Sequence, residues 1–288
     1  MNTRLIAALL ICLAAVALVF PNFERARREV SQVELKELTL PPFVSRFLAL
    51  EFRSVAADYL FAQVIQFYGG RVQAGETFTP ADWMWLYSNL QVVTDLDPYF
   101  EDPYYFGNAV LTWNGRLYNQ ANRLLQKGAV ARTWDWQFPF YIGFNSFYFL
   151  NDNKGGADYF LMAAKRPGAS PYLPALAARL YKNEGKTALA ISVLTDFLES
   201  ERDPKTRKSF EIRLEALKKI LALEQAVGLF RKKTGRAPRD LQALVEKGLI
   251  TEIPTDPYGG RFYVDKNGSI MTTSNLAFKS GPQQQMQK

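Results

Sequence analysis

The chain has 288 residues, of which 48% are hydrophobic and 22% charged, enough for one extended folded body with a small appendage. It contains no histidine, and its single cysteine, Cys12, lies in an apolar N-terminal run. These counts exclude Ser-His-Asp and Cys-His catalysis, haem ligation, iron–sulfur clusters, Cys/His zinc sites and a disulfide within the chain. We therefore expect no catalytic residue, no metal site and no cofactor.

The N-terminal segment is a candidate membrane anchor. Residues 5–20 are 16 consecutive apolar residues. As a helix they span about 24 Å, somewhat less than the roughly 30 Å of a bilayer's hydrocarbon core. The sequence Ala15-Val16-Ala17 leaves a cleaved signal peptide open as an alternative. We expect an uncleaved anchor or signal-anchor over residues 1–23, followed by a charged linker over residues 24–42. The flanking basic residues do not decide the orientation.

From residue 43 to about residue 250 the pattern is helical. Apolar residues between Phe47 and Val64 predict a first helix that ends at Gly69-Gly70. The later helices are predicted from their start signals, each a capping side chain followed by proline. These pairs are Thr79-Pro80, Asp102-Pro103, Ser170-Pro171 and Asp203-Pro204. The helix that begins at Pro204 should continue for about 30 residues, to Thr234.

The prolines also indicate a repeat. Pro103, Pro139, Pro171 and Pro204 are separated by 36, 32 and 33 residues. Each of the three units has a small residue four positions after its proline, an aromatic ten positions after it, and another small residue in a second helix. These residues are Gly107, Gly143 and Ala175; Trp113, Phe149 and Tyr181; and Ala121, Ala157 and Ala188. Small residues let two helices approach closely, and we expect the aromatics to fill the core beside them.

This pattern resembles the tetratricopeptide repeat (TPR) family over residues 103–204. The usual tryptophan near the start of each unit is absent. The resemblance implies a TPR-like α–α solenoid over residues 43–204, covered at its end by a long capping helix over residues 205–234.

The last part of the chain differs in kind. A short helix over residues 240–247 precedes two strands, 261–264 and 269–273, joined by a turn at residues 265–268. The segments 234–238, 241–245 and 256–260 resemble the globular core of the major pseudopilins of type II secretion. The pseudopilin processing site, its glutamate in the apolar helix and its calcium-binding loop are absent. The resemblance implies a local fold over residues 235–275 and an extracytoplasmic setting. Residues 276–288 are expected to be a disordered tail.

Three motifs could carry chemistry, and each has a simpler interpretation. Gly185-Lys186-Thr187 resembles the end of a phosphate-binding loop but lacks its first glycine. Residues 151–156 resemble a calcium loop, but Met162 replaces the required glutamate, so a turn is favoured. The carboxylates of residues 95, 97, 101 and 102 could pair as acid and base, although Asp102 is expected to cap a helix.

A protein-binding groove is the main functional hypothesis. Nine of the 16 residues from Trp134 to Phe149 are aromatic, and we expect most of them in the core. In the repeat register, the residue after each proline, and residues one or two turns later, should line a groove. These residues are Tyr104, Leu111, Phe140, Phe147, Tyr172, Arg179 and Lys182. The ligand would be an apolar or aromatic protein segment.

The excess positive charge lies in residues 202–239, with 12 Lys and Arg against four acidic residues. This segment could contact anionic lipid or an acidic partner, and no element for nucleic-acid binding accompanies it.

The sequence as a whole predicts a mostly α protein: an N-terminal transmembrane helix, a TPR-like solenoid, and a small module of helix and β-hairpin. We expect a single-pass protein of the bacterial inner membrane with its C-terminal domain in the periplasm. It would act as a scaffold or adaptor in a pilus-like, secretion or export assembly. Two alternatives are a periplasmic carbohydrate-binding module that uses the aromatic face and a carboxylate-dependent glycan enzyme.

Overall fold

The computed structural model describes residues 52–277, of which 67% are helical, with one small two-stranded antiparallel sheet. The mostly α fold class is thus confirmed. The chain divides into two compact units, residues 1–131 and residues 132–288. The predicted anchor, the linker over residues 24–42 and the end of the tail lie outside the described residues. Between residues 52 and 277, no helix is both long enough and apolar enough to cross a membrane.

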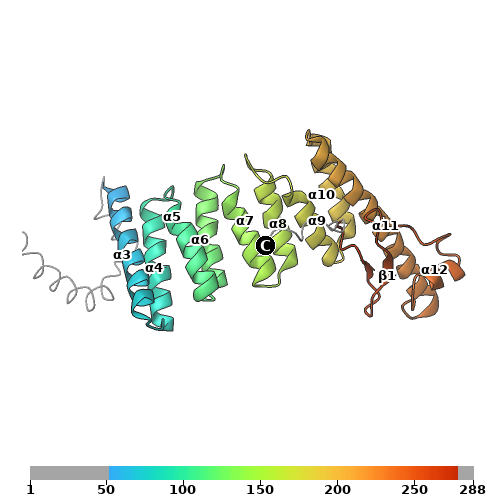
Figure 1. The fold of residues 1–288 in the computed structure, drawn as a ribbon, viewed down its shortest axis with the longest axis horizontal. Helices are drawn as coiled ribbons and strands as arrows, with labels where there is room; N and C mark the ends of the chain where they lie inside the picture. The colour runs from blue at the N-terminus through green and yellow to red at the C-terminus, as the bar shows by residue number, and fades with distance from the viewer. Residues whose placement is uncertain (1–51, 278–288) are drawn as a thin grey trace, which may run out of the picture. The chain divides into compact units, whose positions relative to one another are not determined.

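The first unit is a series of helices in which each packs against the next along the chain (Figure 1). Its elements are α3 (Arg53–Ala74), α4 (Pro80–Leu96), α5 (Asp102–Ala109), the π-helical turn η1 (Val110–Asn114) and α6 (Tyr118–Ala131). The capping prediction for α4 is correct. Thr79 and Asp82 form a reciprocal capping box in which each side chain accepts a hydrogen bond from the other residue's backbone N–H.

The predicted end of α3 is wrong. The helix continues through Gly69-Gly70 and ends at Gly75, whose φ of 67° is left-handed. Glycine within a helix costs only about 1 kcal/mol, which packing can offset. Helices often end at a residue in the left-handed conformation, and here Gly75, not Gly69 or Gly70, adopts it.

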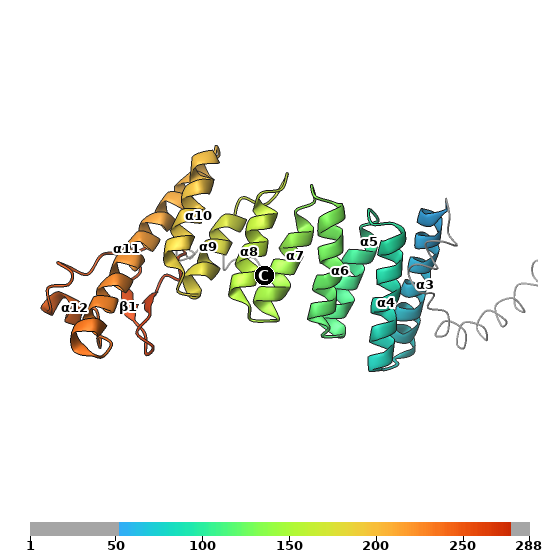
Figure 2. The same cartoon turned by 180° about the vertical axis from the view of Figure 1, so that it is seen from behind.

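The second unit continues the same kind of packing and then changes to the C-terminal module. Its elements are α7 (Gln137–Tyr148), α8 (Asn153–Ala164), α9 (Leu173–Asn183), α10 (Thr187–Ser200), α11 (Pro204–Thr234), α12 (Gln242–Glu246), β1 (Phe262–Val264) and β2 (Ile270–Thr272). Helices α7 to α11 pack in chain order, as both views show (Figures 1 and 2).

Two of the proline-based start signals need correction. Helix α5 begins at Asp102, with Glu101 at the N-cap position, so Asp102 is not a cap. Helix α9 begins at Leu173, and its first turn contains Pro174, while Ser170-Pro171 lies in the preceding turn. The Asp203 prediction is correct, because its carboxylate accepts a 2.7 Å hydrogen bond from the Thr206 backbone N–H at the start of α11.

Small residues mark two of the predicted close contacts between paired helices. A Cβ atom on Gly107 in α5 would lie 2.5 Å from Leu124 Cδ2 in α6. A Cβ atom on Gly143 in α7 would lie 2.9 Å from Phe160 Cδ1 in α8. The second-helix residues Ala121 and Ala157 are fully buried. Ala188 is instead exposed, and Ala190 occupies the core of α10.

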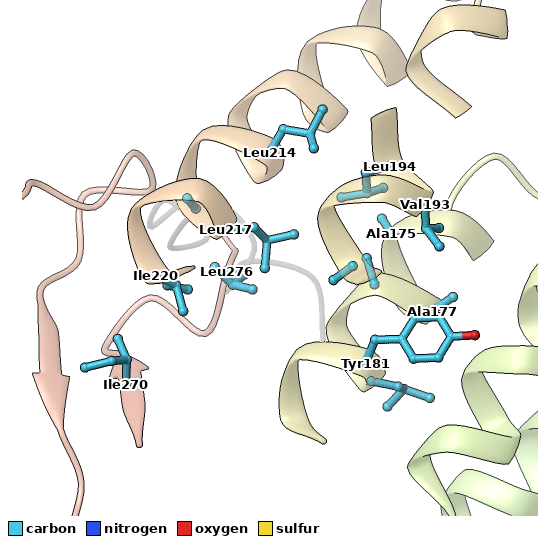
Figure 3. Close-up of a cluster of buried hydrophobic side chains, with 14 of the residues drawn as sticks. Ala175, Ala177, Tyr181, Val193, Leu194, Leu214, Leu217, Ile220, Ile270 and Leu276 are labelled. Carbon is cyan, nitrogen blue, oxygen red and sulfur yellow. The ribbon is translucent and has the colours of Figure 1, made fainter. Parts of the chain in front are cut away.

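The C-terminal module packs on α11. Leu217 and Ile220 of α11, Ile270 of β2 and Leu276 belong to one buried cluster, which extends to α9 and α10 (Figure 3). In the hairpin, Phe262 pairs with Thr272 and Val264 with Ile270. Leu276 had been placed in the tail, yet it is buried, and its carbonyl accepts a 2.8 Å hydrogen bond from Arg213. The folded chain therefore extends at least to Leu276.

Candidate binding surface

The seven residues predicted to line a groove differ in exposure. Tyr104, Leu111 and Lys182 are buried, Phe140 and Phe147 are half-buried, and Tyr172 and Arg179 are exposed. The expectation that the residue after each proline is part-exposed is therefore wrong for Tyr104. Its ring lies in the core of the first unit, and its hydroxyl donates a 3.1 Å hydrogen bond to the Pro98 carbonyl.

Leu111 lies seven residues after the fully buried Tyr104 and shares its buried face; it is the second residue of the π-helical turn η1. A π turn holds more residues than an α turn, so residues beyond Ala109 are rotated around the helix axis relative to an α-helical register. Leu111, expected in the groove, is fully buried, while Trp113, expected in the core, is 60% exposed. Both predictions assumed an unbroken α-helix. Of the other two aromatics at this repeat position, Tyr181 is buried as expected and Phe149 is half-buried.

Lys182 is buried by the C-terminal module. Its side chain is only 8% exposed, and its Nζ lies 3.3 Å from Met271 Sδ in β2. Beside it, the Thr187 hydroxyl of α10 donates a 2.9 Å hydrogen bond to Glu224 of α11. Lys182 and Met271 are 89 positions apart, so a repeat register cannot place them together. Lys182 thus joins α9 to the hairpin.

Burial dominates the electrostatics of this polar cluster. Desolvation lowers the pKa of Lys182, and the nearby carboxylates of Glu224 and Asp265 only partly oppose it. Burial likewise raises the pKa of Glu224, against the hydrogen bond from Thr187 and the charge of Lys182. Burial thus makes each of the two groups harder to charge than it is in water.

A second polar cluster joins α8 to α9. Asp158 accepts hydrogen bonds from the Tyr181 hydroxyl and from Lys154 Nζ, the latter at 2.6 Å. Burial alone would raise the pKa of Asp158, but these two donors outweigh it and the pKa lies below its ordinary value. Burial, aided by the hydrogen bond to Asp158, raises the pKa of Tyr181. Tyr181 therefore remains a neutral donor over the physiological range.

Aromatic residues of α7 and its N-cap lie in a row, of which all but the exposed Tyr148 are half-buried. Trp136, Phe140, Phe144 and Tyr148 follow one another at intervals of four residues and so share one face of the helix; we call them the aromatic stripe. Ring centroids are 5.6 Å apart between Trp136 and Phe140, and 5.2 Å apart between Phe144 and Tyr148. The other face of α7 is buried, through Phe138, Ile142 and Ser146. The aromatics of the stripe are only partly covered, and Tyr148 is exposed, so not all of the aromatic residues lie in the core as expected.

The stripe is anchored in the core and also reaches solvent. The Phe140 ring packs against the buried Phe160 of α8, with a centroid separation of 5.8 Å. At the other end of the stripe, Tyr148 is 56% exposed. Helix α8 packs against both α7 and α9, and α9 adds the exposed Tyr172, 68% accessible, and Arg179. Four of the seven predicted residues, Phe140, Phe147, Tyr172 and Arg179, therefore remain accessible in the second unit.

The other candidate motifs have structural roles. Asp152 of the calcium-loop-like segment caps α8 by accepting a 2.8 Å hydrogen bond from the Gly155 N–H. Gly185, with φ of 70°, lies in the turn between α9 and α10. Asp95 pairs with Lys127 at 2.7 Å. Within residues 52–277, no three carboxylates are arranged to hold a metal ion.

Comparison with known proteins assigns no family to this chain. No protein-family model matches it, and no curated protein matches it at a significant level. The accessible residues of the second unit are therefore the main indication of function.

Proposed function

We propose that this chain is a membrane-anchored scaffold with TPR-like repeats that faces the periplasm and binds an apolar or aromatic segment of a partner protein. The partner would belong to a cell-envelope assembly of the pilus-like, secretion or export kind. The observation that carries the proposal is the aromatic stripe, which is partly exposed on a helix that packs against α8. Half-exposed aromatic side chains are typical anchors of protein interfaces.

The helix pairs support the TPR-like assignment. Helices α5 and α6, α7 and α8, and α9 and α10 are successive packed pairs. Two of the pairs have a glycine at the contact between their helices, at Gly107 and Gly143. Helix α11 then covers the last pair, which is the role of a solenoid cap. The π turn η1 is a departure from a regular repeat.

The C-terminal module supports the pseudopilin-like resemblance and, through it, the extracytoplasmic setting. The Asp256 carboxylate is buried and accepts hydrogen bonds from the Tyr258 N–H at 2.9 Å, the Ser274 hydroxyl at 2.6 Å and the Thr272 hydroxyl. A Cβ atom on Gly260 would lie 2.7 Å from Asp256 Oδ2 and 2.8 Å from the Ser274 nitrogen. The residues that carry the resemblance thus join the 256–260 loop to the end of the hairpin. The apolar run of residues 5–20 supports the anchor.

Site-specific cross-linking tests the binding surface. A photo-reactive amino acid would replace Tyr148 or Tyr172 in the full chain, in its native membrane. We expect protein adducts at both positions and none at Tyr263, an exposed tyrosine of β1 that serves as control. Adducts at all three positions, or at none, would contradict the proposal. Quenching of tryptophan fluorescence by oligosaccharides, without protein adducts, would favour the carbohydrate-binding alternative instead.

Reporter fusion tests the topology. A reporter that is active only outside the cytoplasm, fused after Lys288, should be active, and extraction from the membrane should require detergent. Activity restricted to a cytoplasmic reporter would refute the orientation. A soluble mature chain that begins near Leu18 would refute the anchor.

A further inference from the structure

The structure divides the basic segment of residues 202–239 into two unequal parts. Residues 202–224 contain seven Lys and Arg against four Asp and Glu, whereas residues 231–239 contain five Lys and Arg and no acidic residue. No charged residue lies between the two parts. The first part therefore keeps a smaller excess than the second, in which, within residues 52–277, only Arg239 has an acidic partner, Asp240 at 3.1 Å.

Three of the seven cations of the first part have partners within the described fold. Arg207 pairs with Glu211 at 3.4 Å, and Lys219 with Glu215 at 2.7 Å. Arg213 is half-buried under the C-terminal module, where its guanidinium lies 5.9 Å from the centre of the Tyr258 ring. The remaining cations of this part share it with four acidic residues, whereas the second part has none.

The second part presents free cations on one end of the helix. Lys232, Lys233 and Arg236 are exposed, and within residues 52–277 none of their side chains has an ion-pair or hydrogen-bond partner; the Arg236 carbonyl accepts a hydrogen bond from the Thr234 hydroxyl. Arg231 donates a 2.8 Å hydrogen bond to the Asn267 carbonyl, which holds the hairpin turn and its exposed Lys266 at the same end. We call Lys232, Lys233, Arg236 and Lys266 the basic patch. Figure 1 shows this end of α11 beside α12 and the hairpin.

An exposed leucine lies next to the patch. Leu229 is 49% exposed and precedes Lys232 and Lys233 by three and four positions, so the three side chains share a face of α11. Long lysine side chains around an isolated apolar residue are characteristic of surfaces that rest on a bilayer, because the cations meet the headgroups while the apolar side chain enters the interface.

We propose that the basic patch binds the anionic surface of a phospholipid membrane. A bilayer supplies negative charge without requiring a complementary shape, which suits free cations on one exposed helix end. An acidic protein partner would bind best to cations held in a fixed arrangement. The side chains of Lys232 and Lys233 are held by no ion pair or hydrogen bond within residues 52–277. The inference rests on the patch alone and does not depend on the aromatic stripe or on its partner.

A fluorophore placed in the patch tests the proposal in the full chain. With Cys12→Ser, the substitution Ala237→Cys provides one labelling site at an exposed position between Arg236 and Arg239. The chain is reconstituted into vesicles of phosphatidylcholine, or of phosphatidylcholine mixed with phosphatidylglycerol, each with a neutral headgroup quencher. We expect quenching only in the anionic vesicles, and expect added salt to abolish it.

Matched variants separate the patch from general charge. Each cation near an anionic surface raises the binding constant by about a factor of five. The triple variant Lys232→Ala, Lys233→Ala and Arg236→Ala should therefore lower the equilibrium constant for docking on the membrane by about a hundredfold. The control, Arg202→Ala with Lys205→Ala and Lys208→Ala, removes the same charge from the other end of α11 and should change docking little. Equal quenching in neutral vesicles, or equal loss in both triple variants, would overturn the proposal. A fluorescence change with soluble polyglutamate but not with anionic vesicles would contradict lipid binding and indicate that the patch binds an acidic protein.

Discussion

Gly143 and Gly156 face each other where α7 crosses α8. A Cβ atom on Gly143 would lie 3.0 Å from the Gly156 carbonyl oxygen, and one on Gly156 would lie 3.1 Å from the Gly143 carbonyl oxygen. Backbone atoms cannot move aside as a flexible side chain can. The close approach of the two helices, and with it the position of the aromatic stripe, therefore requires both glycines.

The variant Gly143→Ala should lower the free energy of unfolding by about 1 to 3 kcal/mol, because the added methyl group overpacks the contact. Gly228→Ala is the matched control. It also lies within a helix, but a Cβ atom there would meet nothing within 4 Å. It should stabilise the protein by up to about 1 kcal/mol through helix propensity. Thermal unfolding in mild detergent, followed by circular dichroism, measures both. Equal effects of the two substitutions would contradict the packing argument.

Burial makes the charge of Lys182 costly to the folded chain. Its pKa in the folded protein lies below the ordinary value of 10.5 because of burial. Between these two pKa values the folded chain binds fewer protons than the unfolded chain, so stability rises with pH. Below the folded pKa, the destabilisation caused by the buried charge is fully present.

The variant Lys182→Met should therefore be more stable than the native chain at neutral pH, and the difference should shrink as the pH approaches 10.5. Unfolding midpoints measured at a series of pH values test this. Lys208→Met, a substitution of an exposed lysine, should give a difference that does not vary with pH. A Lys182→Met profile parallel to the native one would show that the lysine is solvated.

At the scale of elements, the first repeat-like pair departs from the expected exposure both before and within η1. The repeat pattern places the proline, the small residue and the aromatic at regular distances, and Pro103 and Gly107 lie where the pattern expects them, both buried. Tyr104, before the π turn, and Leu111, within it, are both fully buried, so the face that they share packs in the core. Trp113, also within the π turn, is instead exposed.

Truncation of the Leu111 and Trp113 side chains tests which of the two is buried. Leu111→Ala should cost about 2 to 5 kcal/mol of unfolding free energy, because it leaves a cavity in a fully buried site. Trp113→Ala should cost less, because 60% of the side chain is already exposed. Urea unfolding compares the two. A larger cost at Trp113 would mean that this segment is α-helical.

At the scale of the whole molecule, the second of the two compact units includes a docked C-terminal module. Leu214, Leu217 and Phe230 of α11 are buried in one cluster with Leu244 and Phe262 of the module. Lys219 Nζ and Arg231 add hydrogen bonds to the carbonyls of Thr255 and Asn267, at 3.0 and 2.8 Å. A two-stranded hairpin is not stable alone in water, and here it takes its stability from α11.

Truncation after Thr234 should therefore expose the apolar side of α11, lower the melting temperature of the remaining chain and promote aggregation. Truncation after Lys279 keeps Leu276 and should leave the melting temperature unchanged. Differential scanning fluorimetry and light scattering measure the two outcomes. Equal melting temperatures for the full chain and the Thr234 truncation would show that the module folds independently of the repeats.

Local signals in the sequence determined much of the architecture. The Asp203-Pro204 start and the Gly235 end define α11 as predicted, and the turn residues between Val264 and Ile270 define the hairpin, because caps and turns depend on neighbouring residues. Tertiary structure decided which side chains are exposed. The burial of Lys182 depends on Met271, 89 residues away, and the burial of Tyr104 and Leu111 on the helices that pack against α5 and η1. Exposure is a property of what packs on a face, and that information is spread over the whole fold.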